Sequence, residues 1–362
     1  MITPHYTKDN LLSVPQSIQA RYGAVPRHAT LPMLDSLLSE KAKNTVLILL
    51  DGLGSDALYA HAPDGFLWRN RMMDLTTVYP STTVAALTSL QSGLSPAEHG
   101  WLGWSCYFKE ISQCVDLFTN RQSGTDAPAE EGIVAKTISY PSLLNQLRTA
   151  DPGLQCHEVS PYSKPAAQRL KDVCKRIEVL CRREGSQYVY AYHPQPDALM
   201  HELGCHDTQI KELILSLDKQ MEALCAALKD TLVIITSDHG MTDVDMLDIE
   251  DYPQIAECLR APISRDFRSL SFHVKKEYLA DFPNRWQDAF HDYNLMSAQE
   301  VLHSGLFGPG RPHARFMDFI GDYAAFATGN RALWYGRLLR FKAAHAGLKH
   351  EEMIVPLIAA RC

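Results

Sequence analysis

The strongest constraint on the fold is a set of short apolar runs, each followed by a turn or by polar residues. Runs that are almost continuously apolar are typical of strands buried on both faces of a parallel sheet. Four such runs occur: NTVLILL at 44–50, QYVYAY at 187–192, TLVIIT at 231–236 and IVPLIAA at 354–360. We therefore expect a β-sheet at the centre of the molecule.

Helical patterns lie between these runs. PSLLNQLRTA at 141–150 and the longer segment 208–230 are the clearest cases. The longer segment has apolar residues at helical spacing: Ile210, Leu213, Leu215, Leu217, Met221 and Leu224. Strands that alternate with helices predict an α/β fold with a mostly parallel sheet covered on both faces. Ligands of such sheets bind beyond the carboxyl ends of the strands.

Carboxylates and imidazoles follow three of the expected strands. Asp51 comes directly after the first run, and Asp238 and His239 follow the run at 231–236. Asp197 and His201 have i, i+4 spacing, which places both side chains on one face of a helix. Each motif alone has an ordinary explanation, since an Asp-Gly pair often makes a turn and an i, i+4 pair often lies on a surface helix.

Two adjacent hydroxyls, Thr82 and Thr83, begin an Ala/Leu-rich segment that ends at Gly93. A threonine at the start of a helix is usually an N-cap. The alternative is a nucleophile, because a helix N-terminus attracts phosphate and a metal ion can lower the pKa of a hydroxyl.

Carboxylates and imidazoles without thiolates form sites for Zn²⁺, or for a similar ion such as Mn²⁺. Three Asp and two His are too many ligands for one tetrahedral ion, and one further ligand would complete two sites. Two ions about 3.5–4 Å apart form the clamp used for in-line displacement at phosphorus. The sequence thus favours a dinuclear site for a phosphate ester.

Composition narrows the choice of partners and location. The net charge of −7 argues against a general nucleic-acid binder, which needs a basic surface. No run of 18 apolar residues and no signal-peptide pattern is visible, and the nine cysteines are irregularly spaced without a CxxC pair. We expect a cytoplasmic protein with reduced thiols, no membrane span and a small-molecule substrate; nothing in the sequence sets an oligomeric state.

Five motifs in order carry a family resemblance. They are LLDGLG at 49–54, YPSTT at 79–83, SGLSPAEHG at 92–100, DALMH at 197–201 and SDHGM at 237–241. A final element is best matched by AAHAGLKHEEMIVPL at 343–357. The chain resembles the type I phosphodiesterase/nucleotide pyrophosphatase family of the alkaline phosphatase superfamily. The resemblance implies a three-layer α/β/α sandwich, as a single catalytic domain over 1–362, in which 265–310 could be a small inserted subdomain.

The resemblance also implies roles for individual residues. Thr83 would be the nucleophile, with Thr82 as the alternative, and would form a covalent phospho-threonine that water hydrolyses. The two metal ions, Zn²⁺ or Mn²⁺, would be held by two sets of ligands: Asp51, Asp238 and His239 beside Thr83, and Asp197, His201 and His345 for the second ion.

His345 has a competitor in His313, which lies in the loop segment GRPHARF. We prefer His345 because it precedes the expected final strand. Of the other histidines, we expect His99 to support its loop by hydrogen bonding, and His193 and His206 to be solvated.

Trp104 is a departure from the family pattern. Many relatives have an Asn at this position, where it binds a phosphate oxygen, whereas an indole offers a single N–H donor. Trp101, Trp104, Tyr107 and Phe108 could line a substrate pocket or pack in a core. The sulfatase motif C/S-x-P-x-R is absent at the nucleophile position, which argues against sulfatase activity.

The leading hypothesis is a metal-dependent hydrolase of phosphodiesters or pyrophosphates. A phosphomonoesterase or phosphonate hydrolase is the alternative on the same frame. A phosphomutase is less favoured, because the 265–310 segment is modest in size. A non-catalytic binding protein is also less favoured, because all six candidate ligands and the hydroxyl are present.

Overall fold

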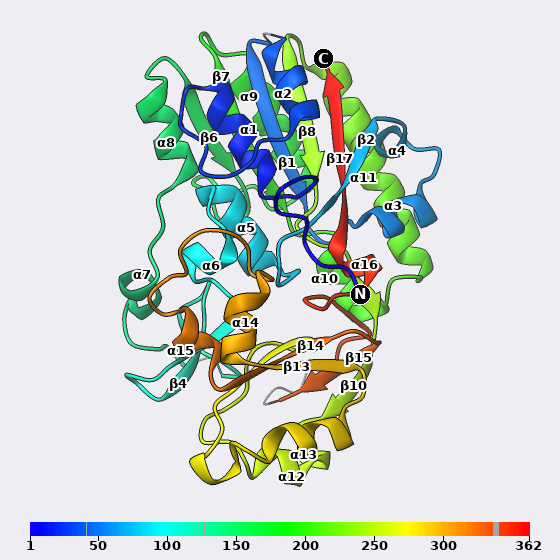
Figure 1. Ribbon diagram of the computed structural model, residues 1–362. Helices are drawn as coiled ribbons and strands as arrows, with labels where there is room; N and C mark the ends of the chain where they lie inside the picture. The colour runs from blue at the N-terminus through cyan, green and yellow to red at the C-terminus, as the bar shows by residue number, and fades with distance from the viewer. Residues whose placement is uncertain (41, 126, 336–339) are drawn as a thin grey trace.

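The computed structural model describes residues 1–40, 42–125, 127–335 and 340–362. Its centre is a six-stranded sheet in the order β2-β17-β8-β1-β7-β6 (Figure 1). The strands are β2 (Arg71–Thr76), β17 (Ile354–Arg361), β8 (Thr231–Thr236), β1 (Asn44–Leu50), β7 (Gln187–His193) and β6 (Gln155–Val159). All four apolar runs are therefore strands, as expected.

The sheet is mostly parallel. β8, β1, β7 and β6 run in one direction, whereas β17 is antiparallel to both β8 and β2. The register pairs Leu50 of β1 with His193 of β7 and Leu49 of β1 with Thr236 of β8. Three strands consequently end at the same level, so the polar residues that follow them meet at one edge.

Helices cover both faces of the sheet, so the predicted three-layer α/β/α sandwich is confirmed. One face packs Val46, Ile48 and Leu50 against a first set of helices, and the other packs Leu47 and Leu49 against a second set. The first set is α3 (Ser55–His61), α4 (Phe66–Arg69), α9 (Leu170–Cys181), α10 (Asp197–Leu203) and α11 (Thr208–Ala227). The second is α1 (Ser13–Arg21), α2 (Pro32–Ser39), α5 (Thr83–Ser92) and α8 (Leu143–Ala150).

A second, antiparallel sheet lies below the first in Figure 1. Its order is β13 (Tyr293–Ser297), β14 (Tyr323–Ala327), β12 (Ser269–Phe272), β11 (Ser264–Asp266), β3 (Ser105–Phe108), β4 (Gln113–Asp116) and β5 (Arg121–Gln122). Residues 265–310 thus contribute strands to a sheet that also draws on 105–122 and 323–327. The subdomain limits of 265–310 stay a prediction.

Helices also flank this second sheet. One core joins Phe272 and Leu270 to α12 (Pro253–Ala256) and α13 (Phe282–Ala289). Another joins Phe108 and Phe326 to a further set of helices: α6 (Pro96–His99), α7 (Ile133–Thr137), α14 (Ala298–Ser304) and α15 (Phe316–Ile320). Across the described residues, every helix is too short or too polar to cross a membrane.

Short elements connect the two sheets. β10 (Asp245–Asp248) pairs with β15 (Arg331–Trp334), and β9 (Thr242–Asp243) pairs with β16 (Ala343–Ala344). α16 (His350–Met353) leads into β17 and approaches the end of β8 closely: the Gly240 N–H donates to the Glu352 carbonyl at 2.9 Å. The segment after β8 and the segment before β17 are therefore packed backbone to backbone.

Gly240→Ala should destabilise the protein, because the added Cβ would overlap the carbonyl oxygen of Glu351. Overpacking of this kind costs about 1–3 kcal/mol in the free energy of unfolding. Chemical denaturation measures the loss. Gly153→Ala is the matched control: it lies in an exposed turn where the Cβ meets only Asp151 Oδ1 at 3.3 Å, so its effect should stay below about 0.5 kcal/mol. Equal stabilities for the two variants would contradict the packing argument.

Candidate active site

The ends of β1, β7 and β8 bring three carboxylates together. The N–H of Asp51 donates to the His193 carbonyl, and the N–H of Asp197 donates to the Asp51 carbonyl, each at 3.0 Å. The N–H of Gly52 donates to Asp238 Oδ1 at 3.1 Å. These backbone contacts fix the relative positions of Asp51, Asp197 and Asp238.

One group of candidate ligands consists of Asp51, Asp238 and His239, all of which are buried. Their ligand atoms lie within 4.8 Å of one another. His239 Nε2 is 3.5 Å from Asp51 Oδ1 and 3.5 Å from Asp238 Oδ2. This is the set that the sequence placed beside Thr83.

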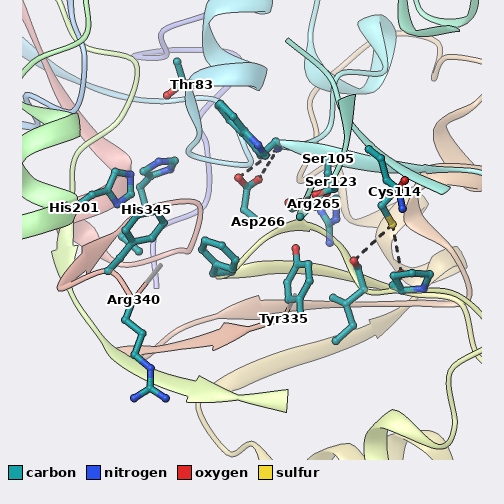
Figure 2. A pocket seen from close by; sticks show the side chains of 18 of the residues that line it. Thr83, Ser105, Cys114, Ser123, His201, Arg265, Asp266, Tyr335, Arg340 and His345 are labelled. Carbon is teal, nitrogen blue, oxygen red and sulfur yellow. Dashed lines mark hydrogen bonds between the residues drawn. The ribbon is translucent and has the colours of Figure 1, made fainter. Parts of the chain in front are cut away.

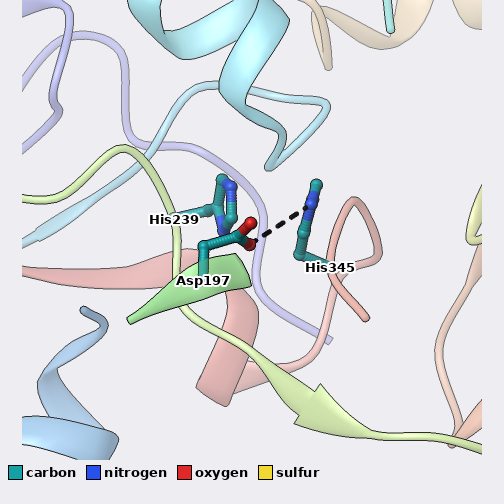
Figure 3. Close-up of side chains that lie close together, drawn as sticks. All are labelled: Asp197, His239 and His345. Atoms are coloured by element: carbon teal, nitrogen blue, oxygen red, sulfur yellow. Dashed lines mark ion pairs between the residues drawn. The ribbon is translucent and has the colours of Figure 1, made fainter. Parts of the chain in front are cut away.

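A second group surrounds Asp197 (Figure 3). Its carboxylate, His345 and His239 have ligand atoms within 4.8 Å of one another. Asp197 Oδ1 is 3.4 Å from His201 Nε2 and 3.7 Å from His345 Nε2. The structure therefore brings all six expected ligands to one place, with His239 between the two groups and its ring stacked on His345 at 3.8 Å.

Each of the three imidazoles is held by a hydrogen bond from its Nδ1 to a backbone carbonyl. Nδ1 of His239 donates to the Gly240 carbonyl at 2.9 Å, that of His201 to the Ala343 carbonyl at 2.8 Å, and that of His345 to the Ser81 carbonyl at 3.0 Å. A carbonyl oxygen only accepts hydrogen bonds, so each Nδ1 carries a proton, and Nε2 is the ring nitrogen that remains to bind a metal ion. This arrangement is typical of metal-ligating histidines.

The carboxylates have matching unpaired atoms. Asp51 Oδ1, Asp238 Oδ2 and Asp197 Oδ1 are buried without a hydrogen-bond donor among the residues that the structure describes, and each is the oxygen that faces an imidazole Nε2. Buried acceptors without donors are costly. Oxygen and imidazole nitrogen are suitable ligands for Zn²⁺ or Mn²⁺. The residues therefore fit divalent cations.

The pKa shifts of Asp51 and His345 also fit a site for cations. Burial, with the nearby carboxylates of Asp238 and Asp197, raises the pKa of Asp51 well above its usual range. Burial, with the nearby imidazoles of His239 and His201, lowers the pKa of His345 well below its usual range. A bound cation would favour both the ionised carboxylates and the neutral imidazoles.

The two threonines have different surroundings. The Thr82 side chain is fully buried, and its hydroxyl donates to Asp266 Oδ1 at 3.2 Å instead of capping α5. Thr83 is the first residue of α5 and is partly exposed at a cavity. Its Oγ1 lies 3.1 Å from Nε2 of the candidate ligand His239. Of the two threonines, Thr83 therefore has its hydroxyl next to a candidate ligand and lines the cavity.

A cavity of about 530 Å³ opens next to Thr83 (Figure 2). It extends from His201 and His345 past Asp266 to the neutral side chains of Ser105, Cys114 and Ser123. Rings in its lining come from Trp104, Phe267, Tyr335 and Phe341. This cavity has the size of a pocket for a drug-sized organic molecule.

Asp266 is the charged group of this wall nearest to the threonines. Its carboxylate accepts from the Trp104 N–H at 3.3 Å as well as from the Thr82 hydroxyl. Burial raises its pKa to about 6, against the opposing effect of these hydrogen bonds and of Arg265. The Arg265 guanidinium lies over the rings of Phe307 and Phe326 and, among the described residues, makes no ion pair with Asp266.

Of the four aromatic residues in question, Trp104 lines the cavity and is 37% exposed. The other three pack elsewhere within the described chain. Phe108 is buried against Phe319, Tyr107 lies against His273, and Trp101 donates its Nε1–H to the Ile138 carbonyl.

The remaining histidines give one correction. His99 is buried between the Ser89 hydroxyl and the Trp101 N–H, which agrees with loop support, and His206 is exposed. His193 is not solvated as expected: it is 7% exposed, and burial lowers its pKa to about 4. The error arose because strand β7 extends through His193 and buries it. His313 instead packs under Gly100 and accepts from the Arg315 N–H.

Sequence reasoning missed Tyr192 and Glu352. The Tyr192 hydroxyl donates to Asp51 Oδ2 at 2.5 Å, so it orients that carboxylate. Its place as the penultimate residue of β7, beside the end of β1, was an available signal. Glu352 accepts from the Gly347 N–H at 2.8 Å in the loop that carries His345. It lies inside the motif at 343–357, but no pattern there gave it a role.

Comparisons with known proteins agree with this geometry. The family model described as type I phosphodiesterase/nucleotide pyrophosphatase matches residues 45–302. Murine ectonucleotide pyrophosphatase/phosphodiesterase 5, solved as an inactive form with AMP, has a TM-score of 0.68 at 14% identity over 89% of this chain and 88% of that chain. The human protein of the same name has a TM-score of 0.67 at 16% identity over 88% and 87%.

A bacterial structure shares the fold as well. Phosphonoacetate hydrolase from Sinorhizobium meliloti, in complex with phosphonoformate, has a TM-score of 0.64 at 16% identity over 89% of this chain and 91% of that chain. At these identities the structural matches establish an alkaline-phosphatase-like fold. Because the family model covers more than half of the residues, the chain belongs to the type I phosphodiesterase/nucleotide pyrophosphatase family.

Proposed function

We propose that this protein is a metal-dependent phosphohydrolase that cleaves a phosphodiester or pyrophosphate bond, with Thr83 as the nucleophile. The observation that carries the proposal is the position of the Thr83 hydroxyl, 3.1 Å from His239 Nε2 and open to a cavity of about 530 Å³. His239 belongs to both candidate ligand groups. Family membership supports this reaction class.

Two sets of residues would hold the two cations. Asp51, Asp238 and His239, with the Thr83 hydroxyl, would hold one, and Asp197, His201 and His345 would hold the other. The unpaired carboxylate oxygens and the Nδ1-protonated imidazoles support this assignment. When bound, such cations supply positive charge that stabilises phosphoryl oxygens and lowers the pKa of a nearby hydroxyl or water.

The chain's own part in the reaction begins with Thr83. Its Oγ attacks phosphorus while the bond to the leaving oxygen breaks, which gives phospho-Thr83 and a released alcohol or phosphate. The N-terminal end of α5, a helix of 10 residues, favours the phosphoryl group through its free N–H groups and dipole. Water then displaces Thr83 from phosphorus, and two in-line steps give overall retention of configuration.

The pocket favours an organic leaving group over a small anion. Neutral side chains and rings form much of its wall, and the Asp266 carboxylate would repel a second carboxylate near the threonines. The phosphonoacetate hydrolase likeness keeps phosphonate hydrolysis as the alternative. The cavity volume and Asp266 support a phosphodiester with an uncharged organic ester group ahead of a phosphonate that carries a second carboxylate.

Thr83→Ala should lower kcat by about 10⁴-fold or more, because removal of a nucleophile removes the covalent route. Unfolding stability should change by less than about 1 kcal/mol, since the side chain is partly exposed. Thr83→Ser, which keeps the hydroxyl, is the matched variant and should retain measurable turnover. A Thr83→Ala protein with unchanged kcat would exclude Thr83 as the nucleophile.

Chelation should abolish hydrolysis, and added Zn²⁺ or Mn²⁺ should restore it, because the carboxylates and imidazoles supply no positive charge clamp for a phosphoryl group by themselves. Metal analysis and initial rates on the same samples measure both effects. Full activity in protein verified to hold no divalent cation would reject the mechanism.

A bis-nitrophenyl phosphate should be hydrolysed with a higher kcat/KM than mono-nitrophenyl phosphate or phosphonoacetate, because the cavity accommodates an organic second ester group. The three compounds are compared at one metal loading. A preference for the monoester would favour a phosphomonoesterase, and a preference for phosphonoacetate would favour a phosphonate hydrolase; either result would reject the diester assignment.

A further inference from the structure

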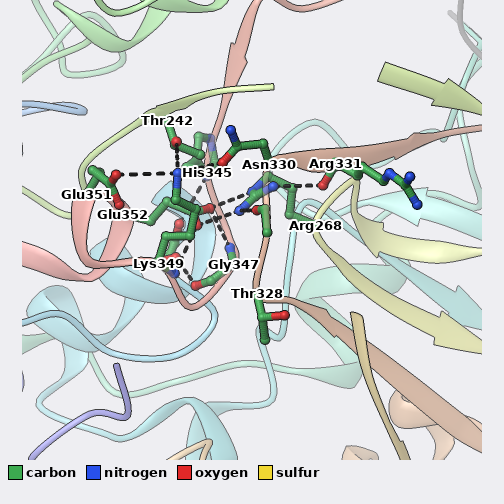
Figure 4. Close-up of polar contacts among 12 residues, drawn as sticks. Thr242, Arg268, Thr328, Asn330, Arg331, His345, Gly347, Lys349, Glu351 and Glu352 are labelled. Atoms are coloured by element: carbon green, nitrogen blue, oxygen red, sulfur yellow. Dashed lines mark hydrogen bonds and ion pairs between the residues drawn. The ribbon is translucent and has the colours of Figure 1, made fainter. Parts of the chain in front are cut away.

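A buried ion pair lies next to the loop that carries His345 (Figure 4). The side chains of Arg268 and Glu352 are both 0% exposed. Arg268 Nε donates to Glu352 Oε1, and Arg268 Nη2 donates to Glu352 Oε2, each at 2.7 Å. This is the two-pronged geometry in which a guanidinium binds a carboxylate most strongly.

The arginine connects this pair to the second sheet. Arg268 lies between β11 and β12, two residues after Asp266 in the cavity wall. Its remaining donors reach the carbonyls of Arg331 at 2.7 Å and Gly329 at 2.9 Å, next to β15. Arg268 is therefore bound both to Glu352 and to the segment at 329–331, which leads into β15 of the β10–β15 sheet.

The glutamate connects the pair to the loop that carries His345. Glu352 Oε1 accepts from the Gly347 N–H at 2.8 Å, and Oε2 accepts from the Lys349 N–H at 3.2 Å. Each carboxylate oxygen thus receives one hydrogen bond from Arg268 and one from the backbone of the loop.

Ser81 holds the same loop from the other side. The Ser81 carbonyl accepts from His345 Nδ1 at 3.0 Å and from the Ala346 N–H at 2.8 Å, and the Ser81 hydroxyl donates to the Gly347 carbonyl at 2.9 Å. Ser81 is two residues before Thr83. The His345 loop is consequently fixed between the segment that leads to the nucleophile and the Arg268–Glu352 pair.

Gly347 shows how closely the loop fits. A Cβ at this position would lie 2.7 Å from Glu352 Oε2 and 2.8 Å from Arg268 Nη2. Both neighbours are fully buried and have little room to move. The loop backbone therefore rests directly on the ion pair.

A purely stabilising role is a weak explanation for this pair. Desolvation of two charges offsets most of their attraction, and well-packed apolar residues often replace such a pair without loss. The Glu352 carboxylate, however, accepts hydrogen bonds from the backbone N–H groups of Gly347 and Lys349 and so fixes the position of the 345–349 loop. An apolar pair could not make these bonds.

We propose that Arg268 and Glu352 are positioning residues, which hold His345 at the distance and angle needed to complete the Asp197/His201/His345 cation site. The proposal rests on the proposed function, because it assumes that these three side chains bind a cation. Loss of the pair should weaken that site and leave the Asp51/Asp238/His239 site largely intact.

Co²⁺ titration of the metal-free protein, followed by visible absorption and by equilibrium dialysis, tests the proposal. The wild-type chain should bind two Co²⁺. Glu352→Gln, which keeps the shape and removes the charge, should weaken one of the two by about 10–100-fold, the usual effect of losing a residue that orients a metal ligand. His345→Ala is the reference for loss of that site, so the two variants should give matching spectra at one Co²⁺ per chain.

Two controls separate positioning from general stability. Glu257→Gln breaks the more exposed ion pair of Glu257 with Arg285 and should leave both Co²⁺ affinities unchanged. Gly347→Ala keeps both charges and displaces the loop, so it should weaken the same single Co²⁺ as Glu352→Gln. Gly153→Ala is its matched glycine control. If Glu352→Gln fails to fold, Gly347→Ala decides.

The outcomes are distinct. Selective weakening of one Co²⁺ in Glu352→Gln or Gly347→Ala supports the proposal. Wild-type affinity at both sites in folded variants, or equal weakening at both sites, overturns it while leaving the proposed function standing. A wild-type chain that binds no Co²⁺, Zn²⁺ or Mn²⁺ overturns the proposed function and this inference together.

Discussion

Three neighbouring carboxylates, two of them buried and one partly exposed, are the constraint on which the rest of this site depends. Asp51 and Asp238 are 2% and 0% exposed, and Asp197 lies beside Asp51. Like charges in a low-dielectric setting repel strongly, so a fold that gathers them must also supply compensation. The Tyr192 hydroxyl and backbone N–H groups compensate some of the oxygens. The oxygens without a donor among the described residues face the Nε2 atoms of three imidazoles, and a cation between these groups would stabilise the arrangement.

Much of this arrangement could be predicted because it follows from strand direction. The runs at 44–50, 187–192 and 231–236 are unambiguous strands, and parallel neighbours end at one edge, so the polar residues after them had to meet. The helices predicted at 141–150 and 208–230 are α8 and α11. α8 begins two residues later than predicted, and α11 ends three residues earlier. The final strand was also found, although its antiparallel direction carries no signature in an apolar run.

The parts that could not be predicted depend on long-range packing. The antiparallel sheet combines β3–β5 with β11–β14, segments more than 140 residues apart, and their short strands have no long apolar run. Asp266 and Glu352 matter because of the residues they contact: Asp266 lies outside the family motifs, and Glu352 lies inside the motif at 343–357 without a pattern that gives it a role. His193 was misjudged for the same reason: a polar residue at a strand end is solvated or buried according to its neighbours, not its sequence.

This division has a chemical consequence. Residues expected to perform the reaction come from the ends of the parallel sheet and the start of α5, whereas much of the cavity wall comes from β3, β4, β5 and β11. The first set fixes the positions of the charged groups, and the second shapes the cavity beside them. The low identity to structures that nevertheless superpose over most of the chain fits this separation. The Arg268–Glu352 pair is where the two parts meet: it joins the turn between β11 and β12 to the loop that carries His345. A change near Arg268 would therefore alter the position of His345.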